Sequence, residues 1–228
     1  MNATEQREQM VEFQIARRGL DDRHLLQAMR VVPRERFVPD EVREYAYEDS
    51  ALPIEGGQTI SQPYIVALMI DAARLAPGER VLEIGTGSGY AAAVMGAIAQ
   101  QVYTIERLPE LAALARQRFA ELGYDNIEVR TDDGTGGWPE QAPFDAILAA
   151  AGGPRVPELL REQLVIGGRL VMPVGDRSGA QRLVKVTRGE HGRYQQVDLG
   201  GVMFVPLIGT YGWDDAPAPP ARGGTPWT

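Results

Sequence analysis

Three glycines at alternate positions, Gly85, Gly87 and Gly89, directly follow a short apolar run that begins at Val81. The alanine-rich segment 91–99 comes next and is typical of a helix. Glycine lets the chain turn tightly and lets a ligand approach the backbone without a Cβ in between. The first N–H groups of a helix are available to a polar ligand. The pattern therefore predicts a nucleotide site between a strand and a helix.

Two acidic residues flank this turn and help to distinguish between nucleotides. Glu83 lies two residues before the first glycine, and Glu106 ends the next apolar run at a spacing that suits a ribose diol. The spacing G-x-G-x-G departs from the dinucleotide fingerprint G-x-G-x-x-G, and no Lys or Ser/Thr follows the glycines in P-loop fashion. A loop flanked by carboxylates suits a cationic sulfonium better than a pyrophosphate. The features resemble class I methyltransferases that use S-adenosylmethionine; a nicotinamide site and a turn without a ligand are the alternatives.

Composition narrows the classes of function. The chain has 228 residues, enough for one domain with a substantial core. It contains no cysteine and two histidines far apart, so we expect neither a thiolate nucleophile nor a metal site. A net charge of −8 without a basic run argues against nucleic acid as a partner. Because no apolar run spans a membrane and residues 1–10 fit no signal peptide, we expect a cytoplasmic protein without a membrane partner.

Strands alternate with helices in the middle of the chain. Apolar runs predict strands at 80–85, 101–106, 126–131, 144–149 and 169–174. The segments between them predict helices at 88–99, 109–122 and 155–164. Three later runs predict antiparallel strands at 181–188, 193–199 and 202–208. This order predicts an α/β fold: a Rossmann-like, doubly wound, mostly parallel sheet with antiparallel strands at its C-terminal end.

The residues before the first strand predict helices and a loop. Helices are expected at 5–18 and 22–32, with Asp21 or Asp22 as a cap of the second, and 34–57 is expected to be irregular. A further helix is expected at 63–75, with Ser61 placed to be its N-cap.

The same patterns suggest how the chain is divided. We expect a single methyltransferase domain at 1–210, in which 1–79 form the substrate-side helices and loop and 80–210 form the Rossmann-like core. The segment 211–228 is rich in Pro and Gly, and we expect it to be a flexible tail. We also expect a monomer.

A second motif, upstream of the glycines, concerns the substrate. The segment 56–64 reads Gly-Gly-Gln-Thr-Ile-Ser-Gln-Pro-Tyr, and 32–39 reads Val-Pro-Arg-Glu-Arg-Phe-Val-Pro. Together with shorter downstream pieces, these closely resemble protein-L-isoaspartate O-methyltransferases over about residues 10–210. The Thr-Ile-Ser-Gln-Pro piece is far more specific than the glycine motif, which many methyltransferases share. The shorter pieces lie at 51–54, 132–134, 137–139, 143–145, 168–175 and 204–207.

The resemblance implies S-adenosylmethionine as the cofactor and isoaspartyl-containing proteins and peptides as the partners. The reaction it implies is methylation of the free α-carboxylate of L-isoaspartyl residues, with Ser61 as the catalytic serine. The cofactor contacts that it implies are Glu83, Gly85, Thr86, Gly87 and Gly89, then Glu106 at the ribose and Asp133 and Gly134 at the adenine. The expected substrate contacts are Thr59, Ile60, Ser61, Val205 and Pro206. One departure is the apolar stretch 148–151, where relatives often carry a threonine.

The chemistry of such a reaction suits this composition. A free α-carboxylate has a pKa of about 3.5, so it is ionised at neutral pH and needs no general base. A neutral hydroxyl such as that of Ser61 can orient it without blunting its attack as a cation would. The structural alternatives are a helix cap for Ser61, a solvated strand end for Glu106 and a turn former for Asp133. The functional alternatives are methylation of another carboxylate and a cofactor-binding adaptor without turnover.

Overall fold

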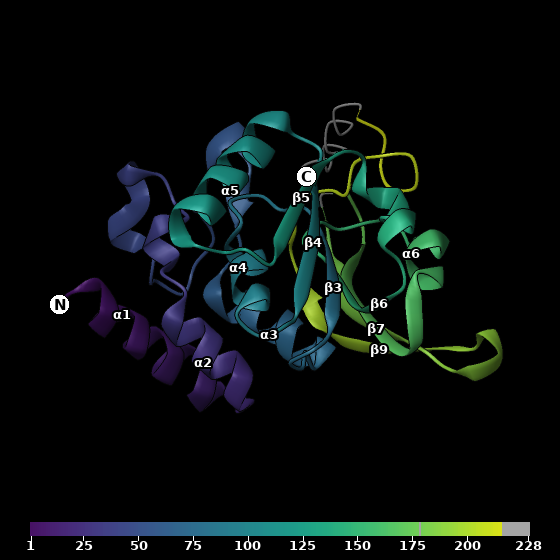
Figure 1. Ribbon diagram of the computed structural model, residues 1–228, viewed down its shortest axis with the longest axis horizontal. Coiled ribbons are helices and arrows are strands. Elements are labelled where there is room, and N and C mark those ends of the chain that lie inside the picture. Colours follow the sequence, from purple (N-terminus) through teal and green to yellow (C-terminus); the bar gives the residue numbers. More distant parts are fainter. Residues whose placement is uncertain (178, 216–228) are drawn as a thin grey trace, which may run out of the picture.

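A seven-stranded sheet runs through the centre of the computed structural model, which describes residues 1–177 and 179–215 (Figure 1). The strand order is β5-β4-β3-β6-β7-β8-β9. The bounds are β3 (Arg80–Ile84), β4 (Gln101–Glu106), β5 (Ile127–Thr131), β6 (Phe144–Ala149), β7 (Leu164–Gly175), β8 (Gln181–Arg188) and β9 (Tyr194–Val202). Strands β3 to β7 pair in parallel, and β8 and β9 add antiparallel. The predicted fold class is confirmed.

Helices cover both faces of the sheet (Figure 1). One face carries α3 (Pro63–Ala73), α4 (Tyr90–Gly96) and α5 (Pro109–Leu122), and the other carries α6 (Glu158–Glu162). Side chains of the central strands alternate between two cores: Val81 and Val102 pack toward the first face, and Leu82 and Tyr103 toward the second. This alternation explains why these strands are apolar throughout their length.

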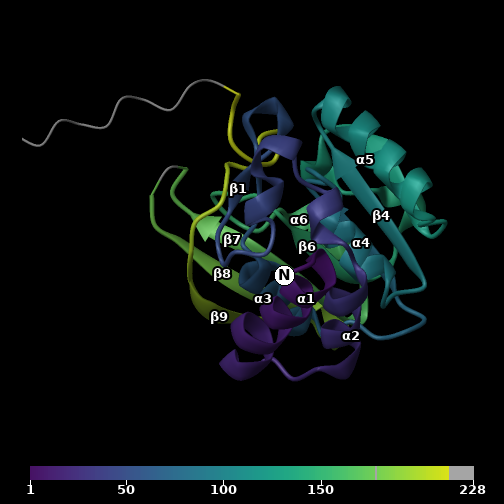
Figure 2. The same cartoon turned by 90° about the vertical axis from the view of Figure 1, so that its left-hand side faces the viewer.

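The N-terminal segment forms an outer layer beside α3. It contains α1 (Ala3–Gln9), a π-helix (Met10–Ile15), a 3-10 turn (Ala16–Arg18) and α2 (Arg23–Val31). Figure 2 shows these elements in front of α3. Asp22 caps α2, as predicted, because its side chain accepts a hydrogen bond from the Leu25 N–H at 2.9 Å. A short hairpin follows, built of β1 (Leu52–Pro53) and β2 (Thr59–Ile60).

The direction of strand addition reverses between β3 and β6. From β3 the chain proceeds to β4 and β5 on one side, and from β6 to β7, β8 and β9 on the other. Such a reversal opens a crevice at the carboxyl ends of the two central strands. The loop after β3 and residues Ala150 and Ala151 after β6 lie at this point, and the Ala150 N–H donates to the Ile84 carbonyl at 2.8 Å. The topology therefore places the glycine motif at the crevice.

Ser61 does not cap α3, so that prediction is wrong. The N-cap is Gln62, which makes no side-chain capping bond, and Pro63 occupies the first turn. Ser61 lies one residue before the N-cap, whereas it is the side chain of the N-cap residue that reaches the N–H groups of the second and third helical residues. No requirement of the helix therefore explains the Ser61 hydroxyl.

Two other predicted elements also differ. Residues 203–208 form no strand: β9 continues to Val202, and Pro206 makes only an isolated bridge with Gly152. Pro206 lacks the N–H that a ladder needs, and the Phe204 backbone bonds to a side chain instead. The helix predicted at 155–164 is limited to α6, because β7 already begins at Leu164.

Residues within 211–215 contact the segments that follow β5 and β6. The Tyr211 N–H donates to Thr135 Oγ1 at 3.1 Å, and Trp213 Nε1 donates to the Gly152 carbonyl at 3.0 Å. For the rest of the predicted flexible tail, 216–228 lie outside the described residues. The domain boundaries stay predictions. Within residues 1–177 and 179–215, no helix has the length and apolar character needed to cross a membrane.

Gly89→Ala is expected to destabilise the protein more than Gly123→Ala. Both glycines have positive φ angles, 93° and 74°, at which an L-residue is strained by about 1–2 kcal/mol. A Cβ at Gly89 would also lie 2.8 Å from Phe119 Cζ, whereas a Cβ at Gly123 would meet nothing within 4 Å. Overpacking adds about 1–3 kcal/mol. Urea denaturation should show this difference, and equal losses would contradict the packing of the α4 N-terminus on α5.

Candidate active site

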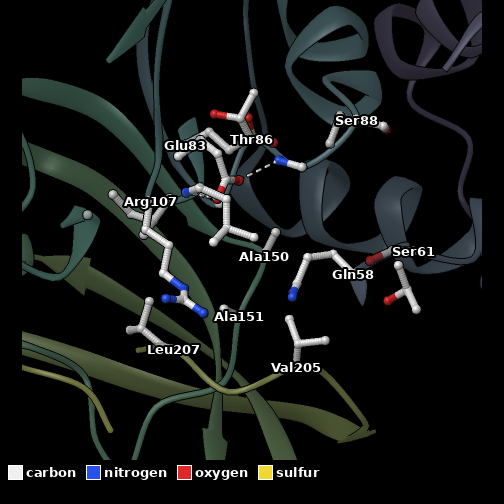
Figure 3. Close-up of a pocket in the computed structure, with 18 of the residues that line it drawn as sticks. Gln58, Ser61, Glu83, Thr86, Ser88, Arg107, Ala150, Ala151, Val205 and Leu207 are labelled. Atoms are coloured by element: carbon white, nitrogen blue, oxygen red, sulfur yellow. Dashed lines mark hydrogen bonds between the residues drawn. The ribbon is translucent and has the colours of Figure 1, made fainter. Parts of the chain in front are cut away.

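The loop between β3 and α4 is shaped by its glycines. Gly85, Gly87 and Gly89 have φ angles of 92°, 52° and 93°, which glycine adopts without strain. The N–H groups of Gly85 and Thr86 both donate to the Ile105 carbonyl, at 2.8 and 3.3 Å, and hold the loop against β4. The loop forms one side of a cavity at the carboxyl ends of β3, β4 and β6 (Figure 3).

Glu106 is the last residue of β4, and its side chain hydrogen-bonds to the same loop. Its Oε2 accepts the Gly87 N–H at 2.9 Å, and its Oε1 accepts the Leu108 N–H at 3.0 Å. The side chain is buried and lines the cavity, so the alternative of a solvated strand end is wrong. A carboxylate oxygen has two lone pairs, so each oxygen can accept one further hydrogen bond from a ligand. A diol, which has two hydroxyl groups that can donate, fits these two acceptors.

Glu83 is fully buried beneath the glycine loop. Its Oε2 accepts a hydrogen bond from Thr104 Oγ1 at 2.6 Å, and Thr104 Oγ1 in turn pairs with Thr86 Oγ1 at 2.6 Å. Desolvation raises the pKa of Glu83 to about 8; the Thr104 bond opposes this rise, and the charge of Glu106 adds to it. The cavity thus has a buried carboxyl group whose ionised form a cationic ligand would stabilise.

The β1/β2 hairpin forms a second side of the cavity. Its tip is tied to the core by Arg118 of α5, which donates to Glu55 Oε1 and to the Ser88 carbonyl, each at 3.1 Å. Residues 58–61, which include β2, line the cavity. The single side chain of Arg118 therefore fixes the hairpin and the glycine loop relative to each other.

The segment 205–208 also lines the cavity. The buried side chain of Gln181 binds both backbone groups of Phe204: Oε1 accepts its N–H at 2.9 Å, and Nε2 donates to its carbonyl at 3.2 Å. Gly152 adds two backbone bonds of 2.8 Å, to Val205 and Leu207. These contacts keep an irregular segment in place beside the site.

Most of the predicted site residues meet around this cavity. Those that line it are Thr59, Ile60, Ser61, Glu83, Gly85, Thr86, Gly87, Glu106, Gly134, Val205 and Pro206. Figure 3 shows Ser61 and Arg107 on opposite sides, with Ala150 and Ala151 between them. Arg107 is a lining residue that the sequence reasoning did not select.

Gly89 and Asp133 do not line the cavity. Gly89 is the N-cap of α4 and packs on α5. Asp133 Oδ1 accepts from the N–H and the hydroxyl of Thr135, and Oδ2 accepts from the Thr210 N–H. Burial raises the pKa of Asp133, but these hydrogen bonds outweigh burial and hold it below the usual value. Asp133 thus shapes a turn, as the alternative proposed, and its contact with adenine stays a prediction.

Three polar contacts escaped the sequence reasoning: those of the buried residues Thr104 and Gln181 and of the half-buried Arg118. Each joins segments that are distant along the chain, so no local spacing indicates it. The one available signal was a polar residue in or beside an otherwise apolar run, as at Thr104 in β4. The described part of the chain holds no group of three or more His, Cys, Asp or Glu residues suited to a metal.

Comparisons with known proteins are consistent with this geometry. The family described as protein-L-isoaspartate(D-aspartate) O-methyltransferase matches residues 5–212. A relative from Brucella anthropi named protein-L-isoaspartate O-methyltransferase is 55% identical over 214 residues, 94% of this chain and 98% of its own. One from Pelobacter propionicus named protein-L-isoaspartate O-methyltransferase 2 is 57% identical over 212 residues, 93% of this chain and 94% of its own.

Two solved structures share the fold. A protein-L-isoaspartate O-methyltransferase is 31% identical with a TM-score of 0.79, and the match covers 90% of this chain and 67% of that one. A putative protein-L-isoaspartate O-methyltransferase from Plasmodium falciparum is 26% identical with a TM-score of 0.77, covering 89% of this chain and 98% of that one. The second structure contains S-adenosyl-L-homocysteine.

Glu83→Gln is expected to remove a pH dependence of stability. The pKa of Glu83 is about 8 in the folded chain against 4.5 when unperturbed, so the folded state holds the extra proton between these values. The stability that this proton provides is complete below pH 4.5 and is lost as pH rises through 8. From pH 5 to 9 the free energy of unfolding should fall by roughly 3–5 kcal/mol more in the wild type than in Glu83→Gln. Parallel pH profiles of the two proteins in urea denaturation would disprove the assignment.

Proposed function

Because the chain belongs to the protein-L-isoaspartate(D-aspartate) O-methyltransferase family, we propose that its cavity methylates the free α-carboxylate of L-isoaspartyl residues in damaged proteins. The observation that carries the proposal is the meeting of the Glu106-bound glycine loop with Ser61 in one cavity. The cofactor is S-adenosylmethionine, and this activity is a step in protein repair.

The residues of the cavity fit this cofactor. S-adenosylmethionine supplies an electrophilic methyl group on a sulfonium. Glu106 has unused lone pairs for the two ribose hydroxyls, and Glu83 provides a carboxyl group that a positive charge would ionise. Gly134 also lines the cavity, and a Cβ there would lie 2.7 Å from Ile84 Cγ2, so the backbone can come close only as glycine.

Ser61 acts on the carboxylate that receives the methyl group. The carboxylate is ionised at neutral pH, so no side chain has to remove a proton, and no histidine is found among the residues lining the cavity. A neutral hydroxyl orients the carboxylate without neutralising it. Most of the acceleration then comes from proximity and alignment, which can supply about 7–11 kcal/mol. The hairpin helps by keeping water away from two opposite charges that combine into neutral products.

The two walls of the cavity explain selection of isoaspartate. In isoaspartate the main chain passes through the side-chain carboxyl, so the free α-carboxylate sits on a branch shorter than in aspartate. We propose that Thr59 and Ile60 on one side and Val205 and Pro206 on the other hold the peptide backbone. A backbone held in this way aligns one carboxylate and displaces the other by about one methylene.

The cytoplasmic location and the monomeric state stay predictions.

The isoaspartyl peptide is expected to accept methyl groups at least about 100-fold faster than its aspartyl twin, since a misplacement of 1 Å can cost that much. The measurement is transfer of labelled methyl groups from S-adenosylmethionine to the paired peptides. Equal rates would indicate an enzyme for carboxylates in general. Cofactor binding without transfer to any carboxylate would indicate an adaptor.

Ser61→Ala is expected to lower kcat/KM for the isoaspartyl peptide by roughly 10- to 150-fold, the value of a hydrogen bond to a charged group. A covalent nucleophile would lose about 10⁶-fold. Because Ser61 does not cap α3, the Tm should not change. Ser50→Ala, outside the cavity, is the control. Wild-type kinetics in Ser61→Ala would remove Ser61 from the reaction.

A further inference from the structure

Arg34 belongs to the 32–39 motif, which the proposed function does not use. Its side chain is 0% exposed and is among the largest fully buried side chains. The groups that influence its charge are two tyrosines, Tyr90 and Tyr47, and no carboxylate of residues 1–177 and 179–215 forms an ion pair with it. A buried charge without a counter-ion is costly and is rare in proteins.

The guanidinium of Arg34 connects three parts of the site. Nη2 donates to the Ser61 carbonyl at 2.8 Å, and Nε donates to the Ala46 carbonyl at 2.7 Å. The centre of the guanidinium lies 4.7 Å from the ring centroid of Tyr90, which begins α4 directly after the glycine loop. Nη1 is buried and has no hydrogen-bond partner among the described residues. Arg34 therefore holds the Ser61 segment against the N-terminal layer and beside the glycine loop.

The charge of Arg34 is only partly offset by these neighbours. Burial lowers the pKa of Arg34, yet an arginine remains protonated in a protein. Two carbonyl dipoles and an aromatic ring stabilise a cation, but they do not cancel its charge. The guanidinium cation of Arg34 thus contacts the backbone carbonyl of Ser61, a residue that lines the cavity. An anion bound beside the Ser61 hydroxyl would feel this charge through protein of low dielectric constant.

We infer that Arg34 is a positioning residue that fixes Ser61 through its carbonyl and selects an anionic group on the substrate. The inference rests on the proposed function, and it names the feature of the substrate that this side of the cavity recognises: the ionised carboxylate. Because the guanidinium donates to backbone carbonyls, it does not clamp the carboxylate directly. It favours binding of the anion and leaves the attacking oxygen without a cationic partner.

The test compares binding of an isoaspartyl peptide with its isoasparaginyl twin, in which a neutral carboxamide replaces the α-carboxylate. Calorimetry in the presence of S-adenosylhomocysteine gives the two dissociation constants. The wild type should bind the isoaspartyl peptide tighter by on the order of tenfold or more. Equal binding of both peptides by a wild type that methylates the isoaspartyl one would overturn the inference. A wild type that methylates neither would instead contradict the proposed function.

Variants separate the charge from its structural role. Arg34→Met should reduce the preference for the isoaspartyl peptide by about tenfold. If Arg34 had a purely structural role, the variant would bind both peptides more weakly by the same factor, and that result would overturn the inference. Arg34→Lys retains the charge and should retain most of the preference, which keeps the test valid if Arg34→Met does not fold. Arg36→Met is the control: Arg36 lies in the same motif, is 51% exposed and pairs with Glu121. Arg107→Met tests the cation on the opposite side of the cavity, and loss of the preference in that variant would contradict the role of Arg34.

Discussion

The carboxylate of Glu106 holds together the two strand ends on which the site depends. It closes β4, and through the Gly87 N–H it fixes the loop that follows β3. A loop with glycine at every second position can adopt many conformations in the unfolded chain. The hydrogen bond from the Gly87 N–H to this charged group favours one conformation of the loop, and a second bond, from the Leu108 N–H, fixes the carboxylate itself. The remaining lone pairs of the carboxylate are left for a ligand. We propose that the fold of the loop and the binding of a nucleoside rest on the same side chain.

The substrate side is assembled differently, through polar side chains that bind backbone groups. Arg118 ties the hairpin to the glycine loop, Gln181 holds Phe204, and Arg34 holds the Ser61 carbonyl. None of these segments is a regular element of the central sheet, so the sheet itself does not place them. Side-chain groups inside the protein that hydrogen-bond to backbone groups fix one arrangement of irregular backbone. This is why a cavity can be bounded by short loops and still keep a defined shape.

The parts of the fold that the sequence predicted are those that depend on local patterns. Apolar runs indicated the strands β3 to β9, and the position of Glu106 after the glycine motif indicated a carboxylate beside the nucleotide site. Segment 202–208 looked like a strand from its apolar residues, but its backbone partners come from Gly152 and Gln181. Ser61 was predicted to cap α3, yet the helix begins at Pro63, so Gln62 and not Ser61 is the N-cap residue. Contacts between a side chain and a distant backbone group leave no periodic signal, so Arg34 and Gln181 could not be assigned from spacing alone.

Glu106→Gln gives the most direct measurement of whether one carboxylate serves both the loop and the ribose. A glutamine amide would turn its NH₂ group toward the N–H of Gly87 or Leu108 and would lose the charge. Hydrogen bonds to charged groups contribute about 1.5–3 kcal/mol, so calorimetry should show S-adenosylmethionine binding weakened by roughly 10- to 150-fold. Glu128→Gln, on the neighbouring strand and exposed, should bind like the wild type. An unchanged affinity of folded Glu106→Gln for S-adenosylmethionine would contradict the role assigned to this residue.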